Sequence, residues 1–591
     1  MSGEREESLL AYANQWLSEF EETIVSLNFE YLEALFCEDS HWRDLLALTW
    51  HIKTISGVKC IKKALKNYVP LAQPSEFQVD SDRTPPRLVT RAGQQAVEVI
   101  FCFKTGVGIG NGVLRLMLNK EQKVPLKAWT LVTALNELDG CEETIGAKRP
   151  KGESYSKDFK GPNWLDQRNT AVAYTDREPA VVVIGGGQAG LSIAARLGQM
   201  KVDTLIVDRE QRVGDNWRKR YHRLTLHNQL HVNHLPYIPF PPSWPTYIPK
   251  DKLAGWFEFY AESMELNFWT ETEFREASYD EVKKRWSIDL YQGHGQTRNI
   301  KPRHIIMATG VSGVPKLPKI PSLKDFDGKV IHSSEYKSSK DWEGKHILII
   351  GSGTSGHDLA QDLYSNDTDV TIVQRSPTTI VDIEPSAQLP YTLYDEGPPL
   401  DDCDLIVAGT PLALMKKTHQ LITEQTKILD KKLLSGLSRV GFEMDFGEDN
   451  TGWQFKYLRR GGGYYFNVGC SNLIVDRKVK LIQYSAINRF VKDGVELENG
   501  KKLKVDLVVM ATGFEGQEYM IRKMFGSEIA KKVGPIWGFN EQQQELRNMW
   551  VKTGQPGLWF IAGSFAQCRI YSKFLGLQIK ACEEGNIPLD H

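Results

Sequence analysis

The residues whose types and spacing most clearly predict a binding function are three glycines at the spacing G-x-G-x-x-G. They follow a run of β-branched residues, Val181–Ile184, and precede an Ala- and Leu-rich stretch with the composition of a helix. A second apolar run, Thr204–Val207, then ends on Asp208. In this order the glycines allow close approach to a pyrophosphate, the helix N-terminus attracts phosphate, and the acidic residue accepts hydrogen bonds from ribose hydroxyls. The expected dinucleotide-binding residues are Gly185, Gly187, Gln188, Ala189, Gly190, Asp208 and Arg209.

A second copy of this arrangement lies further along the chain. The apolar run His346–Ile350 leads into glycines at the same spacing, but the next apolar run, Val370–Val373, is followed by Gln374 and Arg375 rather than an acid. An arginine at this position suits a 2′-phosphate, whereas Asp208 suits free ribose hydroxyls. We therefore expect FAD at the first site and NADPH at the second. The binding residues expected at the second site are Gly351, Gly353, Thr354, Ser355, Gly356 and Arg375.

Other short segments complete the expected cofactor sites. Gly214–Trp217 is similar to the turn that lies along the flavin in oxidoreductases with two dinucleotide sites, which adds Asn216 and Trp217. Two apolar runs, His304–Gly310 and Lys504–Val509, end on or precede Ala-Thr-Gly, a sequence that lets the chain pass close to a dinucleotide. They add Thr309, Thr512 and Gly513, and the second Ala-Thr-Gly is expected to mark the return to the first dinucleotide domain.

Composition limits the function classes. The chain has 591 residues, 41% hydrophobic and 25% charged, and a net charge of −1, which gives no general attraction for nucleic acid or an anionic membrane. The first residues lack the pattern of a secretory signal, and no apolar run is long enough for a membrane span. The eight cysteines form no C-x-x-C, which favours reduced thiols in the cytoplasm. The sequence also offers no persuasive metal cluster or Ser–His–Asp set.

The first part of the chain has a different texture. Helical patterns at residues 8–28, 30–36 and 57–68 precede strand-like runs at 97–103, 112–118 and 128–136, with a polar turn expected near residues 37–44. This order suggests an α+β domain whose curved sheet wraps a helix. The region resembles the SnoaL-like cone fold, including its Trp42-Arg43-Asp44 element. Asp44 is therefore a candidate acid or base, although a structural or assembly role is favoured because fold alone does not establish function.

The segment between the two glycine motifs carries a sharper signal. Phe326, Gly328, His332 and Tyr336 match F-x-G-x-x-x-H-x-x-x-[FY], so the chain resembles the flavin-containing (class B) monooxygenases from about residue 180 onward. Residues 221–245 and 463–469 are most similar to the soluble YUCCA-type branch. The resemblance implies an α/β fold with two Rossmann-like, three-layer (ββα) dinucleotide-binding domains after the cone-like domain. The expected boundaries are 1–145 for the cone-like domain, 146–179 for a linker, 180–335 with 505–591 for FAD, and 336–504 for NADPH.

The resemblance also implies an activity. NADPH would reduce FAD, which would capture O₂ as a C4a-hydroperoxyflavin and pass one oxygen atom to a small organic substrate by N- or S-oxygenation or 2-oxo acid decarboxylation; N,N-dimethylaniline is one such substrate. In this family the histidine motif couples NADPH binding to flavin chemistry. The implied site residues are Asn228, His332 and Tyr336, although an ungapped comparison places His227 where the family has asparagine.

Alternative functions remain open from the sequence. The hypothesis of a Baeyer–Villiger monooxygenase is weakened by Tyr336, because those enzymes typically have tryptophan at this position. A flavin disulfide reductase needs a redox dithiol, which the cysteine spacing does not provide. A non-catalytic nucleotide-sensing scaffold, with the N-terminal domain as its interaction module, is disfavoured by the intact glycines, Asp208 and Arg375. The expected partners are a small-molecule substrate and O₂, with no nucleic acid or membrane; if the protein forms a homodimer, we expect it to do so through the N-terminal domain.

Overall fold

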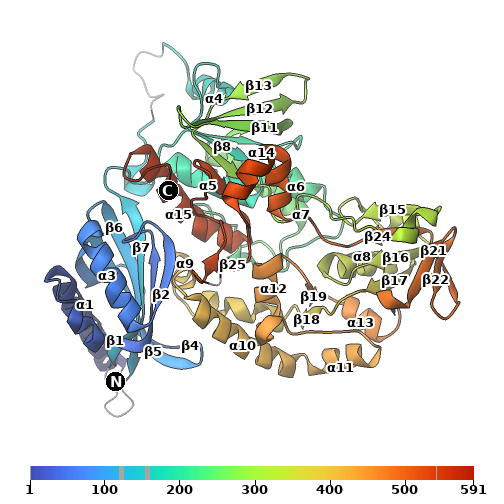
Figure 1. Ribbon diagram of the computed structural model, residues 1–591, viewed down its shortest axis with the longest axis horizontal. Coiled ribbons are helices and arrows are strands. Elements are labelled where there is room, and N and C mark those ends of the chain that lie inside the picture. Colours follow the sequence, from blue (N-terminus) through green and yellow to red (C-terminus); the bar gives the residue numbers. More distant parts are fainter. Residues whose placement is uncertain (1, 119–124, 153–159, 541, 591) are drawn as a thin grey trace.

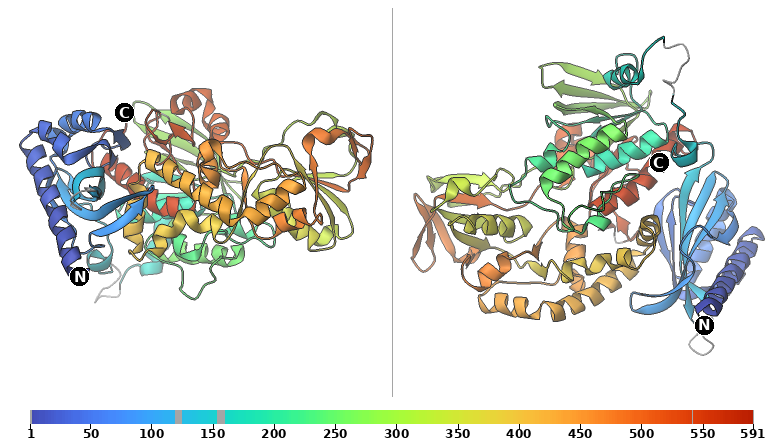
Figure 2. Two further views of the ribbon diagram at one scale, coloured as in Figure 1. Left: turned by 90° about the horizontal axis from the view of Figure 1, so that it is seen from below. Right: turned by 180° about the vertical axis from the view of Figure 1, so that it is seen from behind.

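The computed structural model describes residues 2–118, 125–152, 160–540 and 542–590 of an α/β protein (Figure 1). Part of the expected linker, residues 153–159, lies outside these ranges. Three main sheets follow one another across the molecule: an N-terminal mixed sheet at one end, a parallel sheet in the middle and a second parallel sheet at the far end (Figures 1 and 2). No helix among the described residues is long and apolar enough to cross a membrane.

The N-terminal sheet has seven strands in the order β2-β1-β7-β6-β5-β3, with β4 also paired to β5. Helices α1 and α3 cover one face, where Phe77 stacks on Phe103 with ring centroids 4.9 Å apart. All pairs are antiparallel except β1 with β7. The elements are α1 (Ser2–Val25), α2 (Leu32–Leu35), β1 (Phe36–Leu45), β2 (Ile52–Ser56), α3 (Val58–Ala72), β3 (Ser75–Val79), β4 (Arg87–Arg91), β5 (Gln94–Thr105), β6 (Gly108–Leu118) and β7 (Pro125–Leu138).

The expected polar turn near residues 37–44 is wrong, because this stretch is strand β1. The strand pairs with β2 on one side and β7 on the other, which uses its backbone groups on both edges. Several polar side chains of β1 form hydrogen bonds or ion pairs inside the protein, so these residues can lie in a buried strand. Arg43 and Asp44 are both buried in this strand.

The Asp44 carboxylate is fully engaged by the protein. It accepts hydrogen bonds from the backbone N–H groups of Leu48 and Thr49, from the Thr49 hydroxyl at 2.7 Å and from the Thr133 hydroxyl at 2.6 Å. Burial raises the pKa of Asp44 to about 6, and these hydrogen bonds oppose that rise. The side chain therefore closes the turn after β1 and pins it to β7.

The middle sheet is parallel, with the strand order β10-β9-β8-β14-β27. Helices α5 and α15 pack together beside it (Figure 1). A separate three-stranded antiparallel sheet, β11-β12-β13, is inserted between β10 and β14. The elements are β8 (Val181–Ile184), α5 (Gln188–Gln199), β9 (Thr204–Val207), α6 (Asp215–Arg218), α7 (Lys250–Ser263), β10 (Asn267–Trp269), β11 (Thr272–Asp280), β12 (Arg285–Gln292), β13 (Thr297–Ile300), β14 (His304–Met307), α14 (Gln517–Val533), β27 (Leu558–Phe560) and α15 (Phe565–Glu583).

The second parallel sheet has the order β15-β24-β16-β17-β20, which differs from the expected boundaries. Both β15 and β24 were expected with the first dinucleotide domain. Instead β24 lies between β15 and β16 and pairs in parallel with each, Ile350 facing Met510. The elements are β15 (Lys329–His332), β16 (His346–Ile350), α8 (Thr354–Tyr364), β17 (Asp369–Gln374), α13 (Cys470–Val475), β20 (Lys480–Gln483), β21 (Ile487–Val491), β22 (Gly494–Leu497), β23 (Lys502–Lys504) and β24 (Leu507–Met510).

A largely helical insertion joins β17 to β20 and runs back toward the N-terminal domain (Figure 1). It begins with strand β18, which pairs in parallel with β19, and the 3₁₀ segment η6. Its elements are β18 (Thr379–Asp382), η6 (Ser386–Asp395), α9 (Leu400–Ala408), α10 (Leu412–Leu429), α11 (Lys431–Arg439), α12 (Gly452–Arg460) and β19 (Tyr464–Asn467); the short pair β25 (Phe539–Asn540) and β26 (Glu545–Leu546) lies further along the chain.

Helices α4 and α7 begin in different ways. The expected linker contains helix α4 (Trp164–Ala173), which begins in a capping box formed by Asn163 and Asp166. Helix α7 begins at Lys250 without a side-chain cap, and the Asp251 carboxylate accepts a 2.7 Å hydrogen bond from Lys250 Nζ. Helix α4 therefore begins at a side-chain cap, whereas α7 does not.

Substitution of Asp44 tests its structural role. Asp44→Asn would place amide N–H groups against donors, so we expect it to lower the free energy of unfolding by about 1–3 kcal/mol. Urea unfolding followed by tryptophan fluorescence measures this change. Asp39→Asn is the matched control because Asp39 is exposed on the same strand. Lost turnover with unchanged stability would instead indicate an acid–base role for Asp44.

Candidate functional site

The two glycine motifs form loops of the same geometry at the carboxyl ends of β8 and β16. Gly185 and Gly351 have φ of 109° and 122°, in the region that favours glycine. A Cβ on Gly190 would lie 2.0 Å from the Gly185 carbonyl oxygen, and a Cβ on Gly356 would lie 2.0 Å from that of Gly351. In both loops the first glycine makes the turn and the third lets the helix approach the strand.

The helices that follow are open at their N-termini. Helices α5 and α8 begin after Gly187 and Gly353, neither of which makes a side-chain cap. Their first N–H groups therefore remain available for a phosphate, in addition to the positive end of the helix dipole. Each loop is thus a cradle that fits a dinucleotide pyrophosphate.

Each loop also packs against an Ala-Thr-Gly segment. A Cβ on Gly185 would lie 2.7 Å from the Ala308 carbonyl oxygen, and one on Gly351 would lie 2.3 Å from that of Ala511. Thr309 follows Ala308 in the chain and therefore lies beside the first loop. Thr512 and Gly513 follow Ala511 and lie beside the second loop. The second Ala-Thr-Gly was expected at the first dinucleotide domain, and its contact with Gly351 corrects that expectation.

The residues expected around the first loop lie close to it. Asp208 accepts a 2.7 Å hydrogen bond from the Gly186 N–H and a 2.9 Å bond from the Glu210 N–H. Gln188 Nε2 donates to the Gly563 carbonyl oxygen at 3.2 Å. Asn216 Nδ2 would lie 3.0 Å from a Cβ on Gly187.

Three further expected residues of the first site differ in exposure. Ala189 is buried in the first turn of α5, and the Arg209 side chain is 71% exposed. Trp217 packs against Phe565 with ring centroids 6.1 Å apart. Its Nε1 is buried and has no hydrogen-bond partner among the described residues, so a donor is left for a bound group.

The residues expected around the second loop differ in how far they are buried and in whether they contact other elements. Thr354 Oγ1 donates to the Tyr464 carbonyl oxygen at 2.9 Å, which ties α8 to β19. Ser355 is half-buried in the first turn of α8. Arg375 is exposed immediately after β17 and forms no ion pair with another described residue. Its charge is therefore available to an anion outside the protein.

His332 and Tyr336 connect β15 to the second loop. His332 Nε2 lies 3.0 Å from the Gly513 carbonyl oxygen, which can only accept, so Nε2 carries the proton. Nδ1 then accepts from the Ser334 N–H at 3.2 Å, and burial lowers the pKa of His332. Tyr336 donates a 2.6 Å hydrogen bond to Asp362 on α8, and burial raises the pKa of Tyr336. Both side chains are engaged by the protein and position the loop.

Asn228 and His227 face different elements. Asn228 Nδ2 donates to the Tyr391 hydroxyl at 3.1 Å. The His227 ring lies 3.9 Å from an oxygen of Asp358 on α8 and packs edge-on against Phe466. The segment 227–228 thus bridges the second nucleotide helix and η6, and these contacts are separate from those of His332 and Tyr336.

An aromatic cluster, defined here as Tyr391, Trp453, Tyr457, Tyr464 and Phe466, lies beside both loops. Trp453 contacts Phe466 with ring centroids 4.6 Å apart, and Tyr464 stacks on Phe466 at 5.2 Å. Tyr464 meets the second loop through its carbonyl oxygen. Tyr457 meets the beginning of α15 by donating a 3.0 Å hydrogen bond to Gln567.

Tyr457 and Gln567 were not expected from the sequence. The one local signal was Ser564 followed by Gln567, which forms a capping box at the start of α15. Nothing in the spacing of the aromatic residues marks them as neighbours, because they come from η6, α12 and β19.

The cysteines bear on the disulfide reductase alternative. All eight are free. Cys568, on α15 near the first loop, is buried, and burial raises the pKa of its thiol. A buried, protonated thiol without a disulfide partner does not provide the redox pair that a reductase needs.

Comparisons with known proteins find matches in the part of the chain that contains the two loops. A family model described as pyridine nucleotide-disulphide oxidoreductase matches residues 182–393. Indole-3-pyruvate monooxygenase YUCCA1 of Oryza sativa subsp. japonica is 28% identical over 341 residues, covering 57% of this chain and 77% of its own length. Probable indole-3-pyruvate monooxygenase YUCCA9 of Arabidopsis thaliana is 29% identical over 337 residues, covering 56% and 74%.

A solved structure shares the fold. The structure of a mutant cyclohexanone monooxygenase from Rhodococcus sp. Phi1 bound to NADP⁺ covers 69% of this chain and 86% of its own, with a TM-score of 0.50 and 15% identity. At that identity the likeness describes the fold alone. The similarity to the sequence relatives, which are named as monooxygenases, covers 56–57% of this chain and follows the N-terminal mixed-sheet domain.

Proposed function

We propose that the protein is an NADPH-dependent flavin monooxygenase acting on a small organic substrate, with FAD at the first loop and NADPH at the second. The pair of matched loops carries this proposal, because Asp208 follows the strand after the first loop, whereas Arg375, which forms no ion pair with another described residue, follows the strand after the second. When bound at these loops, the two cofactors would supply hydride transfer and the activation of O₂ for oxygenation of the substrate.

The chain's own residues would bind and orient these groups. The open N-termini of α5 and α8 would hold the two pyrophosphates, and the buried Trp217 N–H would donate to the flavin-side group. His332, as the neutral Nε2–H tautomer, and Tyr336 would hold the second loop in place. In this proposal neither side chain transfers a proton to or from the substrate.

The aromatic cluster suggests the class of substrate. Its rings lie between contacts to the second loop, at Thr354, and to α15, at Gln567. Aromatic side chains favour stacking against a flat apolar group, and the Tyr391 hydroxyl next to Asn228 offers a polar contact. We therefore propose an aromatic substrate, and among the reactions considered an aromatic 2-oxo acid decarboxylation, as the names of the YUCCA relatives suggest.

Isotope labelling tests the activity. The purified protein should carry oxidised flavin and should oxidise NADPH faster when an aromatic 2-oxo acid is present. With ¹⁸O₂, mass spectrometry should find one labelled atom in the carboxylic acid product. An aryl amine, a sulfide and a cyclic ketone complete the panel. Labelled product from only one of these would change the substrate class, and no label in any product would contradict monooxygenation.

The third glycine of each loop gives a paired test of cofactor assignment. Gly190→Ala would force its Cβ against the Gly185 carbonyl, so we expect loss of bound FAD, measured by absorbance per protein. Gly356→Ala should retain FAD but raise the NADPH KM at least tenfold. Gly198→Ala is the matched control, because Gly198 lies in α5 with open space around it. Loss of FAD in Gly356→Ala alone would reverse the assignment of the two sites.

Arg375 tests the choice of NADPH over NADH. Arg375→Ala should raise the KM for NADPH at least tenfold and leave the KM for NADH nearly unchanged, because only NADPH carries the 2′-phosphate. Steady-state kinetics with both cofactors measure the ratio. Arg477→Ala serves as the control, since Arg477 is exposed in the same domain. Equal effects on both cofactors would show that Arg375 does not read the phosphate.

A further inference from the structure

The N-terminal domain is packed into the rest of the chain. The sheet face opposite α1 and α3 meets the helical insertion, where Trp129 packs with Leu414 and a Cβ on Gly409 would lie 2.7 Å from Val132. One continuous cluster of buried apolar residues includes both this domain and the middle sheet, whereas the second parallel sheet has separate clusters. The N-terminal domain and the first nucleotide domain therefore share a core.

Buried polar contacts fix this interface at α9. Arg43 donates to the Ala408 carbonyl oxygen at 2.8 Å and forms an ion pair with Glu545. Asp402 accepts from Arg83 Nη1 at 3.0 Å and from the Thr84 N–H at 2.9 Å. The Arg43 side chain is 5% exposed and that of Asp402 is 4% exposed, so neither charge has water as an alternative partner.

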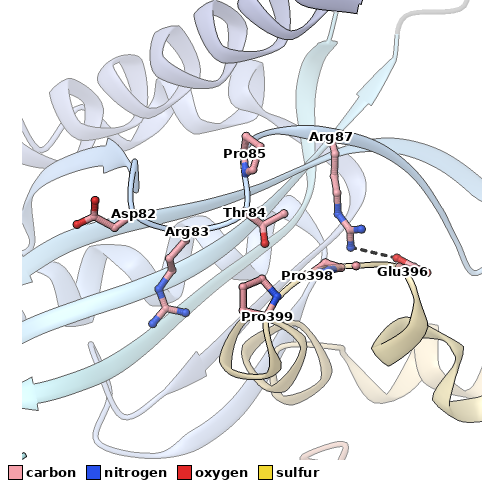
Figure 3. A pocket seen from close by; sticks show the side chains of 9 residues that line it. Asp82, Arg83, Thr84, Pro85, Arg87, Glu396, Pro398 and Pro399 are labelled. Atoms are coloured by element: carbon pink, nitrogen blue, oxygen red, sulfur yellow. Dashed lines mark ion pairs between the residues drawn. The ribbon is translucent and has the colours of Figure 1, made fainter. Parts of the chain in front are cut away.

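A second contact holds the chain just before α9. Glu396, directly after η6, pairs with Arg87 at 3.0 Å (Figure 3) and also with Arg91 at 2.7 Å. Glu396 and Arg87 line an open pocket of about 420 Å³ between the two parts of the chain, where Arg87 points toward Glu396 across the gap (Figure 3). The N-terminal domain thus contacts both α9 and the end of η6.

Helix α9 carries the contact onward to α15. Asp404 lies two residues after Asp402, on the opposite side of the helix. It forms a two-point ion pair with Arg569 at 2.6 and 2.7 Å and accepts from the Tyr394 hydroxyl at 2.8 Å. Arg569 is 2% exposed, and its Nη1 also donates to the carbonyl oxygens of Val232 and His234.

The segments held by Arg569 and Glu396 are those that touch the site. Between Val232 and His234, Asn233 donates to the Asn228 carbonyl oxygen at 3.0 Å. The η6 segment carries Tyr391, which accepts from the Asn228 side chain. The first turn of α15 carries Phe565, which packs against Trp217.

We propose that the N-terminal domain is a positioning element of the monooxygenase site. By holding α9 and Glu396, it sets the Asp404–Arg569 pair and, through that pair, the positions of Asn228, Tyr391 and Trp217. The catalytic consequence rests on the proposed function, whereas the positioning of these segments does not. The residues that carry the effect are Asp402 and Glu396 on the insertion and Arg43, Arg83 and Thr84 on the N-terminal domain.

The test uses the full chain with Asp402→Asn, which weakens the charged contacts of Asp402 with the N-terminal domain. Hydrogen exchange read by mass spectrometry should become at least tenfold faster in residues 228–234, 386–395 and 565–572. Glu33→Gln is the control, because Glu33 pairs with Lys62 away from this interface and should leave those segments unchanged. Asp402→Glu should restore part of the protection.

Activity provides a second readout. Asp402→Asn should send a larger share of NADPH electrons to hydrogen peroxide rather than product, with the KM for NADPH unchanged. If Asp402→Asn fails to fold, Glu396→Gln replaces it. The Glu396 side chain is 33% exposed, so we expect its substitution to disturb folding less.

Two outcomes separate the proposals. Faster exchange confined to residues 80–87 and 400–408, with the site segments unchanged, would overturn the positioning role. A wild-type protein that incorporates no oxygen would overturn the proposed function, and the exchange measurement would still decide the positioning role.

Discussion

The contact between the third glycine of each loop and the carbonyl of the first is the constraint on which the nucleotide sites depend. A Cβ at Gly190 or Gly356 would fall 2.0 Å from that oxygen, so each helix can lie against its strand only because no side chain is there. The same packing brings Ala308 and Ala511 against the first glycines. The strand, the helix N-terminus and the Ala-Thr-Gly segment of each site are thus placed by one close approach, repeated in two sheets.

The interface of the N-terminal domain is stabilised in a different way. Arg43, Asp402 and Arg569 are nearly inaccessible to water, and each meets an opposite charge in good geometry. Burying such pairs gains little over apolar packing, but removing one partner is costly because the other charge is left unpaired. These pairs therefore favour one arrangement of the domains over others more than they add stability. This fits a domain that shares its core with the middle sheet and acts on the site from a distance.

Local patterns predicted the loops well and the sheet partners poorly. The glycine spacing and the apolar runs located β8, α5, β16 and α8, because these features are set within a few residues. The pairing of β24 between β15 and β16 is a contact between distant segments, so the sequence alone placed both strands in the wrong domain. Polar residues in β1 suggested a turn, since their buried partners, such as Glu545 for Arg43, lie far along the chain. The contacts among the aromatic residues could not be predicted for the same reason, and the roles expected for Asn228, His332 and Tyr336 stay predictions.

The fingerprint around His332 shows how such a motif can matter without acid–base chemistry. Gly513 O can only accept and the Ser334 N–H can only donate, so the two contacts together require the neutral Nε2–H ring. A protonated ring would lose the bond from Ser334, and burial already lowers the pKa of His332 against that state. Tyr336 adds a buried bond to Asp362 on α8. Histidine and tyrosine at these positions thus tie β15 to the Ala-Thr-Gly segment and to the helix of the second loop, which explains why the motif lies directly before that loop in the sequence.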